Sequence, residues 1–112
     1  MITIEKLKML GVNTTEGLTR CANNEALYLR LVSTIPGNQG FNKLYEAIKN
    51  EDFESGFSAA HGLKGILANL SIDPILKPVS IITEHLRLKE KMDYSSYVSI
   101  IEENRKKLEE LL

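Results

Sequence analysis

The chain has 112 residues, enough for one domain that buries roughly two thirds of its unfolded surface in a single core. Its hydrophobic content of 43%, charged content of 26% and formal net charge of −1 are ordinary for a globular protein, and they exclude a general attraction to nucleic acid or to an anionic membrane. No apolar run approaches the ~20 residues of a membrane span, and the single cysteine, Cys21, excludes both an internal disulfide and a cysteine metal cage.

Apolar residues recur at helical spacing along the whole chain, and no stretch alternates apolar and polar residues as a strand does. In the first half of the chain we expect four helices, which run over about residues 3–10, from Asn13 through Cys21, from Asn24 through Val32, and over residues 41–49. Gly11 ends the first of them, and the stretch 35–40 around Pro36 is the clearest break.

Three longer helices are expected in the second half of the chain, over about residues 52–70, 74–89 and from residue 93 onward. We expect the stretch Asn50-Glu51-Asp52 to cap the first of them, and Asp73 and Asp93 to cap the other two, with Pro74 at the first helical position of the middle one. Pro78 should kink this middle helix or delay its regular part. The inward stripe of the last helix is Tyr97, Ile101, Asn104, Leu108 and Leu111.

The short connections between these amphipathic helices favour antiparallel neighbours. The predicted fold is therefore all-α, an antiparallel up-down four-helix bundle with a short additional N-terminal helix, forming one domain over residues 1–112. Met1 and the completed bundle favour a whole protein, and we expect it to be a monomer. The N-terminus lacks the basic-then-apolar layout of a signal peptide, which indicates the cytoplasm.

The segment that carries most information about function is His61-Gly62-Leu63-Lys64-Gly65, inside the expected helix over residues 52–70. At about 100° per residue, Ala60, Leu63 and Leu67 centre the apolar arc of that helix, and His61 lies about 120° from this centre. The imidazole should therefore be outside the core or on its rim. Lys64 and Gly65 follow at i+3 and i+4, the spacings at which helical side chains are neighbours.

A glycine inside a helix costs about 1 kcal/mol relative to alanine. Because Gly65 lies away from the predicted core, we interpret it as free space that lets another surface approach His61, with tight helix packing as the alternative. Gly62 adds a second cost in helix stability within one turn, and the sequence pattern does not explain why a glycine stands there. Lys64 would place a cation beside a negative group on His61, although a solvated lysine is the alternative.

An exposed imidazole is largely uncharged near neutral pH, and a neutral ring nitrogen is a nucleophile. The sequence contains no serine or cysteine nucleophile with a visible triad partner. His61 would therefore act by itself, on a partner that supplies the rest of the site.

His61, Leu63, Lys64 and Gly65 together resemble the His-x-Leu-Lys-Gly core of histidine-containing phosphotransfer (HPt) domains, the intermediates of two-component phosphorelays. The following Ala68-Asn69-Leu70 is similar as well, although this family often has a glycine where the chain has Ser71. The stretch over residues 17–28 resembles the first major helix of the family. The glutamate that the family often has late in the next helix has no clear match. Glu84 lies near that position, and the resemblance covers about residues 3–110.

This resemblance implies that His61 accepts a phosphoryl group on its outer ring nitrogen from a receiver-domain phospho-aspartate or a hybrid sensor kinase, and passes it to a response regulator. Lys64 would stabilise the phosphoryl charge, and Gly65 would leave room for the receiver domain. The receiver would supply the aspartate and Mg²⁺, so the domain would be a phosphocarrier without a cofactor, a metal or independent turnover. An apolar patch beside His61 should dock the receiver, with Phe57, Ile4, Leu7 and Leu10 as candidates whose alternative place is the core.

Two other functions stay open on the sequence: a non-catalytic helical adaptor that binds a receiver or kinase without transfer, and a self-sufficient enzyme such as a hydrolase. The sequence contains no glycine-rich phosphate loop that would indicate ATP binding.

His85 lacks a following Lys-Gly and is expected to be structural or at the surface. The spacing of His61, His85 and Cys21 does not support a metal site.

Overall fold

The computed structural model describes residues 1–112, and all of its regular structure is helical, which confirms the predicted all-α class. The seven helices are α1 (Ile4–Leu10), α2 (Thr14–Arg20), α3 (Glu25–Ser33), α4 (Gly40–Lys49), α5 (Phe53–Leu70), α6 (Asp73–Arg87) and α7 (Ser95–Glu109). None of these helices combines the length and the apolar character that crossing a membrane requires.

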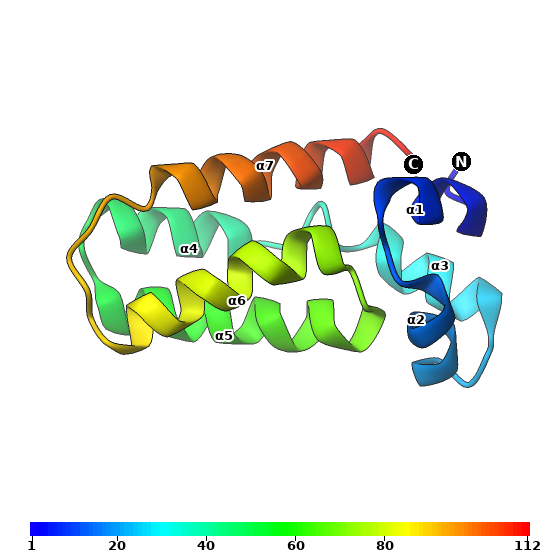
Figure 1. The fold of residues 1–112 in the computed structure, drawn as a ribbon, viewed down its shortest axis with the longest axis horizontal. Coiled ribbons are helices and arrows are strands. Elements are labelled where there is room, and N and C mark those ends of the chain that lie inside the picture. The colour runs from blue at the N-terminus through cyan, green and yellow to red at the C-terminus, as the bar shows by residue number, and fades with distance from the viewer.

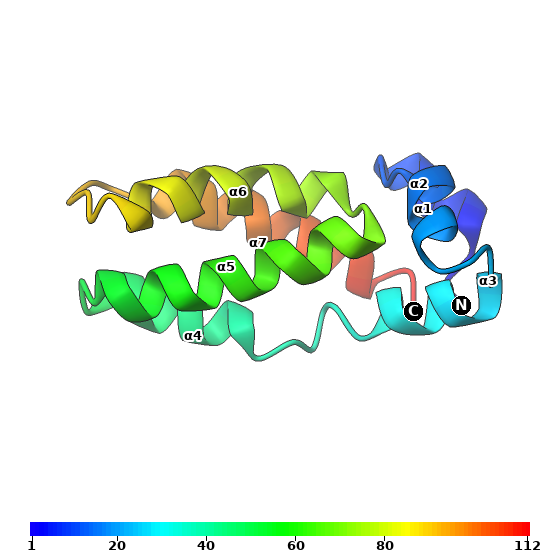
Figure 2. The same cartoon turned by 90° about the horizontal axis from the view of Figure 1, so that it is seen from below.

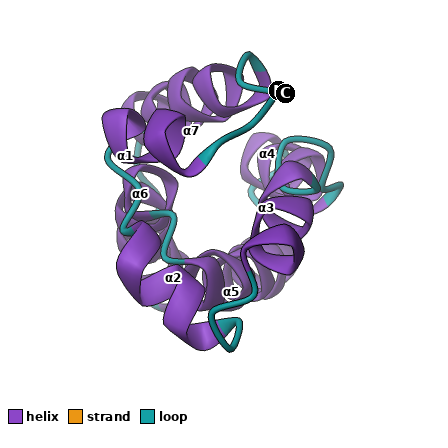
Figure 3. Ribbon diagram, turned by 90° about the vertical axis from the view of Figure 1, so that its right-hand side faces the viewer, coloured by secondary structure: helices purple, strands orange, loops and turns teal.

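The helices α4, α5, α6 and α7 lie along the long axis of the molecule, and α1, α2 and α3 gather at one end (Figure 1). Each of the four long helices runs opposite to the one before it, and α5 packs against both α4 and α6 (Figure 2). Seen along the long axis, the four follow one another around the molecule (Figure 3). This arrangement leaves one side of α5, between α4 and α6, for contact with solvent.

The core lies between the long helices, and α5 contributes to it with the arc that the helical periodicity predicts. Ala60, Leu63 and Leu67 are all buried. In α7 the fully buried residues are Ile101 and Leu108. The other members of the predicted stripe, Tyr97, Asn104 and Leu111, are half-buried. The periodicity therefore predicts correctly which faces of α5 and α7 are turned inward.

Side-chain caps begin most of the helices where the sequence predicts them. The side chains of Asn13, Asn24 and Asp52 each accept a hydrogen bond from a backbone N–H in the first turn of α2, α3 and α5. Asp93 accepts from the N–H of Ser95 at 2.9 Å, so it caps α7 from one residue outside the usual position. Local hydrogen bonding thus fixes where these helices start.

The prediction that Asp73 caps α6 is wrong. Ile72 is the N-cap, no side chain caps the helix, and Asp73 is its first residue. Ile72 is fully buried and its carbonyl accepts from the N–H of Leu76 at 2.8 Å, so packing of Ile72 in the core starts the helix one residue early. The helix then continues through Pro78 to Arg87, so Pro78 does not delay its regular part.

A set of polar contacts joins α4 to α7. Tyr45 donates to a Glu102 carboxylate oxygen at 2.6 Å, and burial together with Glu102 raises the pKa of this phenol. Arg105 donates from Nε to the carbonyl of Pro36 at 2.8 Å and lies over the Phe41 ring, 4.7 Å from its centroid. These contacts tie the last helix of the chain to the turn that precedes α4.

Ser71 ends α5 in the left-handed conformation, with φ +54° and ψ +41°. A residue other than glycine is strained by about 1–2 kcal/mol in this region. Ser71 is also buried, and its hydroxyl has no hydrogen-bond partner. The helix end therefore closes with the backbone geometry that a glycine adopts most readily, although the residue is a serine.

We expect Ser71→Gly to raise the free energy of unfolding by about 1 kcal/mol, since it relieves the strained φ and removes the unpaired hydroxyl. Urea unfolding followed by circular dichroism measures this difference. Ser71→Ala, which keeps the strain and removes the hydroxyl, should gain less. A Ser71→Gly variant that is less stable than the Ser71→Ala variant would contradict the assignment of strain.

Candidate functional site

The candidate site lies midway along α5, on the side of that helix turned away from the core. His61 is exposed, as its angle from the apolar arc predicts, and its chain neighbour Ala60 is fully buried. No hydrogen bond or ion pair engages the His61 ring, whereas the hydrogen bonds of α5 hold its backbone in place. Both nitrogens of the ring are therefore open to a partner.

One aromatic contact does engage His61. The Phe57 ring, one turn earlier, is stacked on the imidazole with centroids 5.5 Å apart and an interplanar angle of 18°. Phe57 is half-buried and packs against the core, so its ring is both a core contact and the neighbour of His61.

Two glycines, Gly62 and Gly65, leave the backbone of α5 uncovered beside His61. A Cβ atom placed on Gly62 or on Gly65 would meet nothing within 4 Å. Tight helix packing is therefore wrong as an explanation of both residues. By contrast, a Cβ on Gly17 would come within 2.5 Å of the Tyr28 ring. Gly62 and Gly65 thus leave open space next to His61.

Lys64 is half-buried in α5, and it forms no ion pair. The charge of Lys64 acts on Glu84 of α6, whose carboxylate is bound by Arg87 at 3.0 Å. Arg87 and, more weakly, the charge of Lys64 hold the pKa of Glu84 below its usual range. Glu84 is therefore occupied by Arg87, which leaves the Lys64 ammonium available to a negative group near His61.

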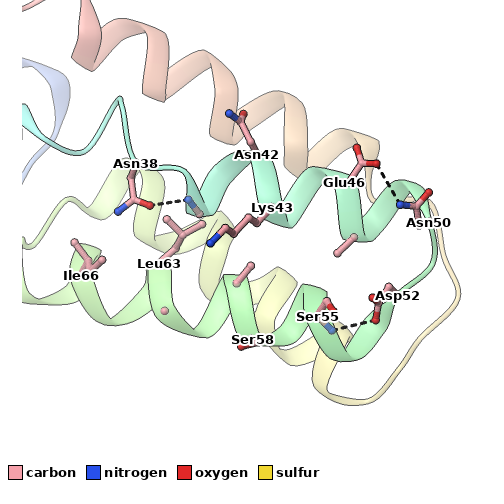
Figure 4. Close-up of a pocket in the computed structure, with 14 residues that line it drawn as sticks. Asn38, Asn42, Lys43, Glu46, Asn50, Asp52, Ser55, Ser58, Leu63 and Ile66 are labelled. Carbon is pink, nitrogen blue, oxygen red and sulfur yellow. Dashed lines mark hydrogen bonds between the residues drawn. The ribbon is translucent and has the colours of Figure 1, made fainter.

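A groove of about 870 Å³ runs between α4 and α5 on the other flank of His61 (Figure 4). Ser58 and Gly62 line it from α5, close in the helix to His61, and Lys43 lines it from α4. Ile66, also in its wall, is 41% exposed. Sequence reasoning missed this groove. The sequence feature that could have indicated the groove is a set of small residues at helical spacing, Ser55, Ala59 and Gly62.

The first helix does not supply the expected docking patch. Leu7 is fully buried, Ile4 and Leu10 are half-buried against the core, and α1 packs on α2 and α7. The apolar face of α1 covers the end of the core, where the N-terminal amine also donates to the carbonyl of Leu112 at 3.3 Å. Of the four candidates, Phe57 alone lies beside His61.

The other residues singled out in the sequence lie elsewhere. His85 Nδ1 is 3.0 Å from a Glu90 carboxylate oxygen, and its ring lies near those of Tyr94 and Tyr97. Cys21 is a buried free thiol. The structure brings together no group of three histidine, cysteine or acidic side chains that could hold a metal ion.

Comparison of the chain with protein-family models, with curated proteins and with solved structures gives no match.

Proposed function

We propose that this protein is a phosphorelay intermediate of the HPt type, in which His61 reversibly carries a phosphoryl group. The observation that supports this most is the exposed His61, on a helix face that Gly62 and Gly65 leave without side chains and next to the unpaired Lys64. In this proposal α4 to α7 form the antiparallel four-helix bundle of that family. The three N-terminal helices close one end of the bundle.

The bond-forming step requires one nucleophile from this chain, the imidazole of His61. The lone pair of the outer ring nitrogen of His61 attacks the phosphorus of a receiver's phospho-aspartate. The N–P bond forms and the aspartyl O–P bond breaks, with the carboxylate leaving with the bonding electron pair. The other ring nitrogen keeps its proton. Return transfer is the reverse step, with the aspartate of a second receiver as the nucleophile.

The flanking residues have separate roles in this proposal. The Lys64 ammonium attracts the phosphoryl oxygens, an interaction worth about 1 kcal/mol in water and up to ~4 kcal/mol near a protein surface. Gly65 gives the receiver's surface access to the ring. The receiver supplies the acidic site and Mg²⁺, which neutralises the transferring group. A response-regulator receiver domain and a hybrid sensor kinase are thus the expected partners.

The direct test mixes the purified protein with a phosphorylated receiver domain and Mg²⁺ and follows acid-labile, base-stable phosphate on three proteins: wild type, His61→Gln and His85→Gln. We expect label on wild type and on the His85→Gln variant and none on His61→Gln. His85→Gln is the matched control because His85 is the other histidine of the chain and lies on the neighbouring helix. All three proteins should have the same circular dichroism spectrum.

Label on His61→Gln would show that the phosphoryl group is carried elsewhere and would contradict the proposal. Binding of receivers without label on wild type would favour the alternative, a helical adaptor without transfer. The groove between α4 and α5 is the surface that such an adaptor would use.

A further inference from the structure

The Phe57–His61 stack is the one directional contact that the structure gives to the proposed phosphate carrier. The rings are nearly parallel, and their centroid separation of 5.5 Å lies within the range of favourable aromatic pairs. The core holds Phe57, whereas His61 projects to the surface. The stack therefore connects a half-buried side chain that packs against the core to an exposed imidazole.

We infer that Phe57 is a positioning residue for His61: its ring covers one face of the imidazole and fixes the ring orientation, while the ring edge stays free for the incoming phosphorus. The inference rests on the proposed function and describes how its site is prepared. The nitrogen lone pairs of an imidazole lie in the plane of the ring. Stacking on the face thus restrains the nucleophile without blocking its line of attack.

Two physical effects make such a stack useful for transfer. An exposed histidine samples several side-chain rotamers, and fixing one before the partner arrives reduces the entropy lost in reaching the reactive geometry. After transfer, the ring bears a proton on one nitrogen and the phosphoryl group on the other, so the ring itself is positively charged. A cationic ring over the face of Phe57 is held more strongly than a neutral one. The stack therefore favours the phosphorylated ring over the free ring.

The test compares wild type with Phe57→Leu, Phe57→Tyr and Phe53→Leu. Leucine at position 57 keeps an apolar side chain against the core but removes the aromatic face, and tyrosine restores that face. Phe53→Leu is the matched control, because Phe53 is a half-buried phenylalanine of the same helix that also packs against the core. Each protein is measured in two ways: the NMR shifts of the His61 ring protons, and the rate of phosphoryl acceptance over a range of phosphorylated-receiver concentrations.

In wild type the Phe57 ring current should shield the His61 ring protons, so Phe57→Leu moves them downfield, and Phe57→Tyr and Phe53→Leu leave them in place. We expect Phe57→Leu to lower the maximal rate of acceptance about three- to tenfold, with an unchanged receiver concentration at half-maximal rate. Phe57→Tyr should restore the rate, and Phe53→Leu should not change it.

If the chemical shifts of the His61 ring protons were unchanged in Phe57→Leu, the two rings would not be stacked in solution. If those chemical shifts changed but the maximal rate of acceptance did not, the stack would exist without a role in positioning His61. An equal loss of rate in Phe53→Leu would assign the effect to packing and would also overturn the inference. Acceptance by none of the proteins, wild type included, would instead contradict the proposed function. The NMR comparison distinguishes that result, because it reports the stack without any transfer.

Discussion

Replacing Gly65 with glutamine should make the protein more stable and at the same time a poorer phosphoryl acceptor. Position 65 is an open helix surface, so glutamine gains the ~1 kcal/mol of helix propensity that glycine lacks without any clash in the free protein. A helical side chain points toward the turn before it, which here carries His61. The glutamine would thus occupy the space through which we propose that the receiver approaches, and we expect acceptance to slow about tenfold or more.

The measurement pairs urea unfolding with the transfer assay on the same preparation. Ser99→Gln is the control, because Ser99 is an exposed residue of α7, outside α5, and a glutamine there should leave transfer unchanged. Full acceptance by Gly65→Gln would show that the space above Gly65 is not used by the partner. A loss of stability in Gly65→Gln would show that the surface is covered.

Gly17→Ala should have the largest effect on stability of any glycine substitution in the chain. A Cβ on Gly17 would lie 2.5 Å from Cε1 of Tyr28 and 2.7 Å from the backbone oxygen of Leu70. Neither can move easily, since the Tyr28 hydroxyl donates to that same oxygen at 2.8 Å in a buried hydrogen bond. Burial raises the pKa of Tyr28 to about 12, so this donor keeps its proton at neutral pH.

We expect Gly17→Ala to lower the free energy of unfolding by about 2–3 kcal/mol, even after the gain in helix propensity. For a domain of this size the midpoint of thermal unfolding should fall by about 10 °C. Gly65→Ala is the control, because the same change at an open position should raise stability by up to about 1 kcal/mol. A Gly17→Ala variant as stable as wild type would mean that α2 does not pack as closely against the end of α5 as the structure shows.

Features set by local physics could be predicted from the sequence. The exposure of His61 and the burial of Leu67 follow from an angle of 100° per residue, which any regular helix imposes. The helix starts at Asn13, Asn24 and Asp52 follow from side chains that accept a hydrogen bond from the backbone N–H three residues later.

Features set by distant contacts could not be predicted in this way. Ile72 starts α6 ahead of Asp73 because it packs in the core, and α1 lies against α7 because the two ends of the chain meet. Helical spacing makes Phe57 a neighbour of His61 but does not set the angle between their rings. The groove between α4 and α5 depends on how two helices are placed side by side, which the pattern of either helix alone does not contain.

The proposed function requires His61 to be a reversible carrier, and ³¹P and ¹H NMR of one sample test this directly. The protein is phosphorylated by a receiver, separated from it, and then mixed with a second, unphosphorylated receiver and Mg²⁺. We predict a phosphorus resonance coupled to the His61 ring protons that disappears as the second receiver is phosphorylated. The role of His61 as a reversible carrier would be contradicted by a phosphorus resonance on another residue. It would also be contradicted by a resonance on His61 that the second receiver does not remove.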